Sequence, residues 1–275
     1  MGHGKLRKFA ENETFRCLVQ PAASEVLVKG SGKLVLKDHP IKGNWGRDVF
    51  GNDNPIVLEL GCGGGEYTIA LAGRNPSVNY IGVDIKGARL WKGAKYATEN
   101  ALPNVAFLRT RIEFITAFFA PSEVSGIWLT FSDPQLSGSE NSRLSSPMFL
   151  DRYRSFLTPG GTIRLKTDSR FLYEYTMSVI RANDLRLIKS SLDVYADDNV
   201  DPAVTQVQTF YEKMFLQMGL PITYLAFCID HDGPYVYPTD FDAPFWRAAE
   251  GPRRSFSHQP SAKNAIFVDG TAETH

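Results

Sequence analysis

From Pro55 onward the chain alternates short apolar segments, rich in β-branched and aromatic residues, with segments of helical character. Strands that alternate with helices form βαβ units, so this pattern predicts a parallel sheet with right-handed crossovers. We therefore expect an α/β fold with a doubly wound, mostly parallel, seven-stranded sheet. The predicted strands cover residues 56–60, 79–85, 104–110, 126–131, 161–167, 185–191 and 222–229, and the last is expected to be antiparallel.

Periodicity also divides the chain into three parts. Residues 1–54 lack sustained periodicity and are predicted to form an N-terminal arm, with short strands at best. The alternating domain occupies residues 55–230. Residues 231–275 are rich in Pro, Gly, Asp and aromatic side chains, and are predicted to be an irregular or disordered C-terminal extension.

The composition, 43% hydrophobic and 22% charged, is typical of soluble globular proteins. No apolar stretch approaches the roughly 20 residues of a membrane span, and no apolar segment follows the first basic residues as in a secretory signal. The three cysteines have neither metal-site nor disulfide spacing. We expect a cytoplasmic protein, a monomer or homodimer, without a metal.

The formal net charge is zero, which argues against a general polyanion binder. The charge is not evenly distributed, because residues 1–54 carry nine Lys and Arg against six Asp and Glu. Residues 231–275 carry four against six. A polyanion would therefore contact the N-terminal arm more readily than the C-terminal extension.

A glycine turn follows the first predicted strand in the sequence VLELGCGGGEYTIALA. Gly61, Gly63 and Gly65 allow a tight turn and the close approach of a ligand to the backbone. Glu59 lies inside the apolar strand, where it would repel a pyrophosphate but favour a cationic amino group. Asp84 ends the next strand, where an acid accepts hydrogen bonds from ribose hydroxyls. This combination favours S-adenosylmethionine (SAM) over NAD.

Several segments, in order along the chain, resemble the bacterial tRNA (guanine-N7)-methyltransferases, the TrmB family of class I SAM-dependent methyltransferases. The resemblance covers roughly residues 4–229 and implies a Rossmann-like fold, SAM as methyl donor, and guanine N7 of a variable-loop guanosine in tRNA as acceptor. The segments that carry it are LELGCGGGEYT, NYIGVDIKGARLWKGA, IWLTFSDPQ, LTPGGTIRLKTDS, TFYE at 209–212, and the N-terminal KLRKFAE.

The family motif F-P-D-P corresponds here to Phe131-Ser132-Asp133-Pro134. The resemblance makes Asp133 the central active-site acid, in contact with the cofactor. Guanine N7 has a lone pair and no proton to lose, so the reaction needs in-line positioning more than a general base. We assign Asp133 to orientation and to stabilisation of the charge that develops on the purine.

The resemblance also implies a set of substrate-binding residues. The T-D motif places Asp168 at the guanine, whose N1 and N2 donors a carboxylate can accept. The late motif T-x-[FY]-E is matched by Thr209, Tyr211 and Glu212, although helix packing alone would also explain Tyr211. The family's substrate-contacting lysine corresponds to Ser137.

Two positions depart from the family pattern. Residues 135–142 contain no Lys or Arg, and only Arg143 keeps the basic character of the family's loop, so we expect weaker tRNA binding with a shallower salt dependence. Arg111 stands near the expected adenine site, where many relatives have an acid or an amide, and it cannot accept a bond from the adenine amino group.

Other basic residues offer compensation. Eight of the nine basic residues of the arm could supply a basic face, namely Lys5, Arg7, Lys8, Lys29, Lys33, Lys37, Lys42 and Arg47. Lys86, Arg89, Lys92 and Lys95 lie near one side of a predicted helix, and we interpret them as a solvated surface in preference to a tRNA contact.

Three other hypotheses remain open at this point. One is a SAM-dependent methyltransferase with a different acceptor, although the second proline and the aromatic of [ND]-P-P-[YF] are absent. Another is a catalytically impaired relative that binds SAM or tRNA, which the two departures favour and the retained acids oppose. A dehydrogenase is the weakest, because no hydride-transfer constellation is present.

Overall fold

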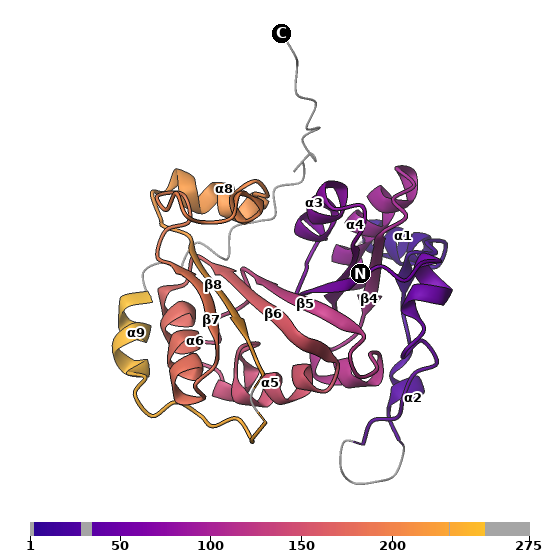
Figure 1. Cartoon of the computed structure of the whole chain (residues 1–275). Coiled ribbons are helices and arrows are strands. Elements are labelled where there is room, and N and C mark those ends of the chain that lie inside the picture. The colour runs from indigo at the N-terminus through magenta and orange to yellow at the C-terminus, as the bar shows by residue number, and fades with distance from the viewer. Residues whose placement is uncertain (1–2, 29–34, 231, 251–275) are drawn as a thin grey trace.

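An eight-stranded sheet forms the centre of the computed structural model, which describes residues 3–28, 35–230 and 232–250 (Figure 1). The strand order is β1-β4-β3-β2-β5-β6-β8-β7. Neighbouring strands are parallel, except that β8 is antiparallel to both β6 and β7. The strands are β1 (Leu18–Val19), β2 (Ile56–Leu60), β3 (Asn79–Asp84), β4 (Val105–Arg109), β5 (Val124–Thr130), β6 (Leu157–Thr167), β7 (Leu187–Ser191) and β8 (Thr223–Cys228).

The doubly wound α/β fold is confirmed, but the predicted number of seven strands is wrong. The additional strand is β1, in the predicted N-terminal arm, where Leu18 lies opposite Phe107 of β4. Two residues are too few to produce an alternating pattern in the sequence. This strand is therefore recognised by its pairing with β4 and not by its own sequence.

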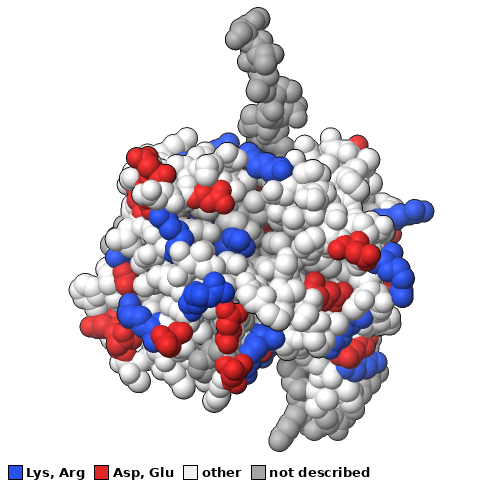
Figure 2. Space-filling view, in the orientation of Figure 1, with Lys and Arg blue, Asp and Glu red and all other residues white. Residues whose placement is uncertain are grey.

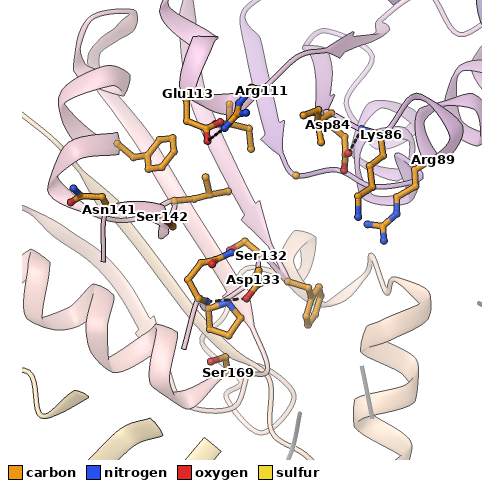
Figure 3. Close-up of a pocket in the computed structure, with 18 of the residues that line it drawn as sticks. Asp84, Lys86, Arg89, Arg111, Glu113, Ser132, Asp133, Asn141, Ser142 and Ser169 are labelled. Atoms are coloured by element: carbon orange, nitrogen blue, oxygen red, sulfur yellow. Dashed lines mark hydrogen bonds and ion pairs between the residues drawn. The ribbon is translucent and has the colours of Figure 1, made fainter. Parts of the chain in front are cut away.

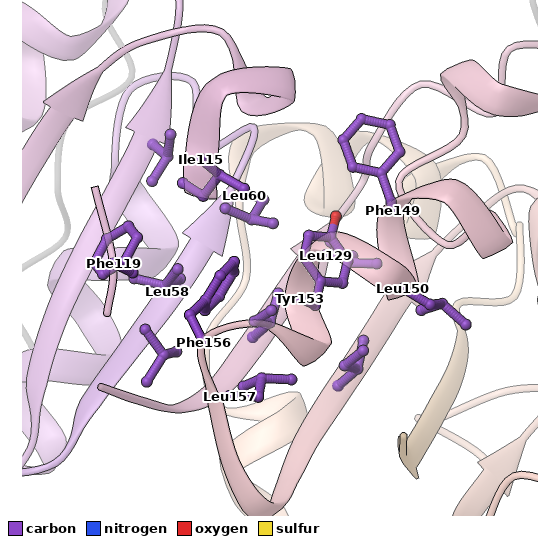
Figure 4. Close-up of a cluster of buried hydrophobic side chains, with 14 of the residues drawn as sticks. Leu58, Leu60, Ile115, Phe119, Leu129, Phe149, Leu150, Tyr153, Phe156 and Leu157 are labelled. Atoms are coloured by element: carbon purple, nitrogen blue, oxygen red, sulfur yellow. The ribbon is translucent and has the colours of Figure 1, made fainter. Parts of the chain in front are cut away.

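Helices cover both faces of the sheet. On one face Leu58, Leu60 and Leu129 pack against α5 and α6, as part of the cluster in Figure 4. On the other face Tyr80 and Phe107 pack against α3 and α4. The helices are α1 (His3–Asn12), α2 (Ala23–Val26), α3 (Glu66–Arg74), α4 (Gly87–Glu99), α5 (Pro147–Arg154), α6 (Arg170–Ala182), α7 (Pro202–Thr205), α8 (Phe210–Gln217) and α9 (Ala243–Glu250), with shorter helical segments at η1 (Gly46–Phe50), η2 (Ile112–Ala117) and η3 (Glu140–Ser142).

Both ends of the chain contain helices that sequence periodicity did not predict. In the arm, α1 packs on α4, where the Trp91 indole donates to Glu11 at 2.6 Å. In the extension, α9 packs on α6, so residues 243–250 are not irregular. Helices this short are marginal alone and depend on tertiary packing. The predictions for Lys29, Lys33 and residues 251–275 lie outside the described residues.

The sheet order places the ligand-binding end of the fold between β2 and β5. The chain proceeds outward from β2 through β3 to β4, and then returns to add β5 on the other side of β2. Ligands of such sheets bind beyond the carboxyl ends of the strands at this switch in direction. The glycine turn after β2 and the segment with Asp133 after β5 therefore lie at the same edge.

Glu59 connects three elements at this edge. One of its carboxylate oxygens accepts from the backbone N–H of Thr68 at 2.8 Å and from the Thr68 hydroxyl, at the start of α3. The other accepts from the hydroxyl of Thr130, at the end of β5. Burial raises the pKa of Glu59 to about 7, although the bonds from Thr130 and Thr68 favour the ionised form.

A second buried acid positions α8. The Glu212 carboxylate lies 2.6 Å from the Lys166 ammonium of β6, and both side chains are 0% exposed. Lys166 also donates to the carbonyls of Val204 and Val207, and the Tyr195 hydroxyl donates to Glu212 at 2.7 Å. Burial lowers the pKa of Lys166, against the opposing effect of Glu212. The start of α8 is thus held against the carboxyl end of β6.

The raised pKa of Glu59 predicts a pH-dependent stability. As the pH rises from 4.5 to about 7, the unfolded chain loses this proton while the folded protein retains it, so the free energy of unfolding falls. This term amounts to about 3 kcal/mol and is absent from Glu59→Gln. Urea unfolding near pH 5 and pH 8 should show the variant gaining stability relative to the unmodified protein as pH rises. A difference that does not change with pH would contradict the prediction.

Breaking the Lys166–Glu212 pair should be costly. Glu212→Ala leaves a buried ammonium without its partner, and we expect a loss of about 3–5 kcal/mol in urea unfolding. Replacing both residues, as Lys166→Met with Glu212→Leu, should recover most of this loss. The control is Asp240→Asn in the exposed Arg181–Asp240 pair, which should cost less than about 1 kcal/mol. If Glu212→Ala and Asp240→Asn lowered the free energy of unfolding equally, the buried pair would not be important for stability.

Candidate active site

A cavity of about 830 Å³ opens at the carboxyl edge of the sheet. Its lining comes from the ends of β2, β3, β4 and β5, from the loop after β5, from the residues between β6 and α6, and from α4, α5, α8 and α9. Figure 3 shows Ser132 and Asp133 between Asp84, on the side of β3, and Ser169 at the start of α6. The cavity thus has one side at the glycine turn and another at the start of α6.

The glycine turn adopts the conformation that its sequence predicts. Gly61 and Gly65 have φ of +80° and +75°, which L side chains rarely adopt. A Cβ at Gly65 would also lie 2.4 Å from the Phe107 ring. Asp84 lines the cavity and accepts from Gly63 N at 3.0 Å and Lys86 N at 2.7 Å. Its carboxylate is therefore fixed beside the turn.

Asp133 lines the cavity on a loop with an unusual backbone. Phe131 and Gln135, on either side of it, have φ of +49° and +51° although neither is glycine. The Gln135 N–H donates to the Asp133 carboxylate at 2.9 Å, which sets the direction of the side chain. Backbone conformations of this kind tend to occur at functional sites. Asp133 thus lies in the cavity, just beyond the carboxyl end of β5, and its role as the central acid stays a prediction.

Arg143 does not act as a surface cation, contrary to our expectation. Only 4% of the residue is exposed. It donates to the carbonyl oxygens of Pro134 and Gln135 at 3.2 and 3.4 Å, and stacks 4.8 Å from the Phe171 ring and 4.5 Å from the Tyr175 ring. An arginine enclosed by rings and carbonyls cannot neutralise a phosphate, so its function is to hold the Asp133 loop against α6.

The structure separates the five predicted substrate residues into two groups. Asp168 and Tyr211 line the cavity. Ser137 is exposed, outside the lining. Thr209 and Glu212 form a capping box at the start of α8 and are also outside the lining. Their direct contact with substrate stays a prediction, and what the structure shows is that they position Tyr211.

The predicted cofactor residues also differ in position. Gly61, Asp84, Arg111 and Asp133 line the cavity. Glu59 lies behind the glycine turn, with both oxygens bonded to threonines, and does not line the cavity. Its contact with a cationic amino group stays a prediction.

Glu113 is a cavity acid that sequence reasoning missed. It lies 3.1 Å from the Arg111 guanidinium, and both residues line the cavity after β4 (Figure 3). Although burial alone would raise the pKa of Glu113, its own backbone N–H and Arg111 lower it. Arg111, which departs from the family pattern, is thus followed two residues later by a hydrogen-bond acceptor, Glu113. This spacing is visible in the sequence as R-I-E.

The basic residues in α4 and at its N-cap, Lys86, divide in a way that helical spacing did not predict. Lys86 and Arg89 line the cavity, whereas Lys92 pairs with Glu66 at 2.6 Å and Lys95 lies 3.6 Å from Glu99. We interpreted all four residues as a solvated surface, and this interpretation did not foresee that Lys86 and Arg89 line the cavity. Elsewhere on the face shown in Figure 2, basic and acidic side chains are interspersed.

Two further observations concern the described residues only. Within residues 3–28, 35–230 and 232–250, no helix is long and apolar enough to cross a membrane. Across the same ranges, His, Cys, Asp and Glu side chains form no group of three that would hold a metal ion. The cysteines Cys17, Cys62 and Cys228 are all free thiols.

Comparisons with known proteins agree with the motifs. A family described as "Putative methyltransferase" matches residues 53–225. The tRNA (guanine-N(7)-)-methyltransferase of Christiangramia forsetii is 46% identical over 226 residues, 82% of this chain and 97% of that protein. The protein of the same name from Bacteroides thetaiotaomicron is 46% identical over 233 residues, 85% of this chain and 88% of that protein.

A solved structure shows the same fold. The 16S rRNA methyltransferase KamB aligns with a TM-score of 0.53 at 18% identity, covering 74% of this chain and 98% of that one, a likeness that concerns the fold alone. The family predicted from the motifs is confirmed by the similarity to the curated relatives. This chain belongs to the tRNA (guanine-N(7)-)-methyltransferase family.

Proposed function

We propose that this protein is the enzyme that transfers a methyl group from SAM to N7 of a guanosine in tRNA. The family and the names of its relatives support the reaction, and the resemblance supports the variable loop as the position in tRNA. The observation that carries the proposal is the position of Asp133, in one cavity with the glycine turn and Asp168.

The residues on the β2–β4 side of the cavity fit SAM. Asp84 would accept from the ribose hydroxyls, and the backbone of the glycine turn would lie against the amino-acid portion. Glu113, held by Arg111, would accept from the adenine amino group, which an arginine cannot do. SAM supplies the activated methyl group as a sulfonium.

Asp133 would act through its charge and its position. Guanine N7 attacks with a lone pair that is already available, so no proton has to leave the base. Positive charge develops on the purine as the new bond to N7 forms, and a carboxylate held by Gln135 N stabilises it. The loop bonds from Arg143 keep this carboxylate from reorienting.

The other side of the cavity would hold the nucleoside. Asp168 and Tyr211 approach it from β6 and α8, and the carboxylate is suited to the guanine N1 and N2 donors. Tyr211 is 50% exposed, and its ring would contact a base or the ribose.

One observation favours unusual tRNA binding within this function. The loop at 135–142 has no basic residue, and Arg143 is buried. The cations that line the cavity on the side of α4 are the exposed Lys86 and Arg89. Fewer phosphate contacts at the loop imply a shallower dependence of affinity on salt than in relatives with a basic loop.

The reaction can be tested by transfer of labelled methyl from SAM to unmodified tRNA transcripts. One transcript carries guanosine in the variable loop, and its control carries adenosine at that position. We expect transfer to the first only, and a loss of at least about 100-fold in Asp133→Asn, because the carboxylate charge is removed from the reacting atoms. Transfer to neither transcript at low or at moderate salt, despite SAM binding, would support another acceptor or a binding role.

The assignment of Glu113 predicts a loss of SAM affinity upon substitution. Glu113→Ala should weaken SAM binding about tenfold in calorimetry, because the adenine amino group loses its acceptor. Arg111→Met should have a smaller effect, since it only releases Glu113. The matched control is Glu99→Gln on the exposed end of α4. Unchanged affinity in Glu113→Ala would remove this residue from the cofactor site.

A further inference from the structure

The segment 232–250 lies beyond the residues that the family model matches, yet it is fixed to the catalytic domain. Asn183 exchanges two hydrogen bonds with the backbone of Val236, at 2.9 and 2.7 Å. Phe241 packs edge-on against Phe171 and Tyr175, with ring centroids 5.1 and 5.3 Å apart. Figure 1 shows α9 beside α6 as a result.

The same segment reaches the Asp133 loop. Arg247 of α9 donates to the Leu136 carbonyl at 2.7 Å. Upstream of α9, the Tyr237 hydroxyl is hydrogen-bonded to the Asn141 side chain, which lines the cavity. Residues 232–250 thus connect α6 to the loop that carries the reaction.

Glu250, at the end of α9, lies in the cavity itself. It is 4% exposed, and its carboxylate accepts from the backbone N–H of Phe171 at 3.2 Å, in the first turn of α6. Asp168 and Ser169, immediately before α6, line the same cavity. Glu250 therefore places a second carboxylate, in addition to that of Asp168, on the side of the cavity where we expect the N1 and N2 donors of guanine.

The Watson–Crick edge of guanine has more hydrogen-bond donors than one carboxylate can accept. When N7 points toward Asp133, the opposite edge presents N1–H and the two hydrogens of the 2-amino group. One carboxylate can pair with two adjacent donors side by side, which leaves one hydrogen of the amino group without an acceptor. A carboxylate that already accepts from Phe171 N still has lone pairs for that hydrogen.

We propose that Glu250 is a specificity-determining residue that accepts from the 2-amino group of the target guanine, beside Asp168. This assignment rests on the proposed function. The bond from Phe171 N fixes the carboxylate, and Arg247 and Phe241 fix the helix that carries it. The substrate side of the site is then completed by a residue from outside the matched region.

The test compares guanosine with inosine at the target position of the tRNA transcript, because inosine retains N7 and N1–H but lacks the 2-amino group. The measurement is kcat/KM for methyl transfer by the full-length protein and by Glu250→Gln. The glutamine keeps an oxygen for Phe171 N but not the negative charge. We expect the unmodified enzyme to prefer guanosine at least about tenfold, as sites built to bind an N–H group do.

In Glu250→Gln we expect this preference to shrink about tenfold, through lower activity on guanosine with little change on inosine. The matched control, Asp240→Asn, removes an acid of the same segment from an exposed pair and should keep the preference. SAM affinity and melting temperature should stay the same in both variants.

Equal losses on guanosine and inosine in Glu250→Gln would assign the residue a structural role and overturn the proposal. So would an unchanged preference in this variant. If the unmodified enzyme methylates neither transcript, the proposed function fails and this assignment fails with it. Transfer to both transcripts at equal rates would refute the assignment while leaving the proposed function intact.

Discussion

The site depends first on a buried carboxylate at the point where the sheet changes direction. Glu59 lies on β2 and accepts from Thr68 of α3 and Thr130 of β5, so one side chain fixes the strand ends that precede the glycine turn and Asp133. An acid in this position is unfavourable unless it is bonded, since burial disfavours its charged form. The bonds that satisfy it also hold the end of β5, from which the Asp133 loop continues, beside the glycine turn.

The two halves of the cavity have different structural origins. The side proposed for the cofactor comes from the carboxyl ends of β2, β3 and β4, where parallel pairing places the glycine turn, Asp84 and Glu113 at the same edge of the sheet. The side proposed for the nucleoside is assembled from α8, α9 and the residues between β6 and α6. Buried polar contacts hold these elements, with Glu212 on Lys166 for α8 and Glu250 on Phe171 N for α9. Asp133 lies between the halves, on a loop that Arg143 and Arg247 hold by its carbonyls.

A neutral protein can act on a polyanion if its cations are placed at the site instead of being spread over the surface. Lys86 and Arg89 occupy such positions at the cavity. Arg143 is the one basic residue of the family's loop that this chain retains. Its guanidinium donates to carbonyl oxygens of the loop instead of facing solvent. Under the proposed function, we expect shape and base contacts to contribute more to recognition than in an enzyme with a basic loop.

The sequence by itself determined the βαβ order and the glycine turn with its following acid, because these are local patterns of periodicity and spacing, whereas the role predicted for Asp133 came from the resemblance of its motif to the family. Tertiary structure decided the rest. The short strand β1 is defined by its pairing with β4. The acids Glu59 and Glu212 link separate elements inside the protein because their partners, such as Thr130 and Lys166, are distant in sequence. Arg143 changed from a surface cation to a buried one for the same reason. Glu250 could not be foreseen, since its place in the cavity depends on how α9 packs against α6, and no local pattern encodes a contact across 79 residues.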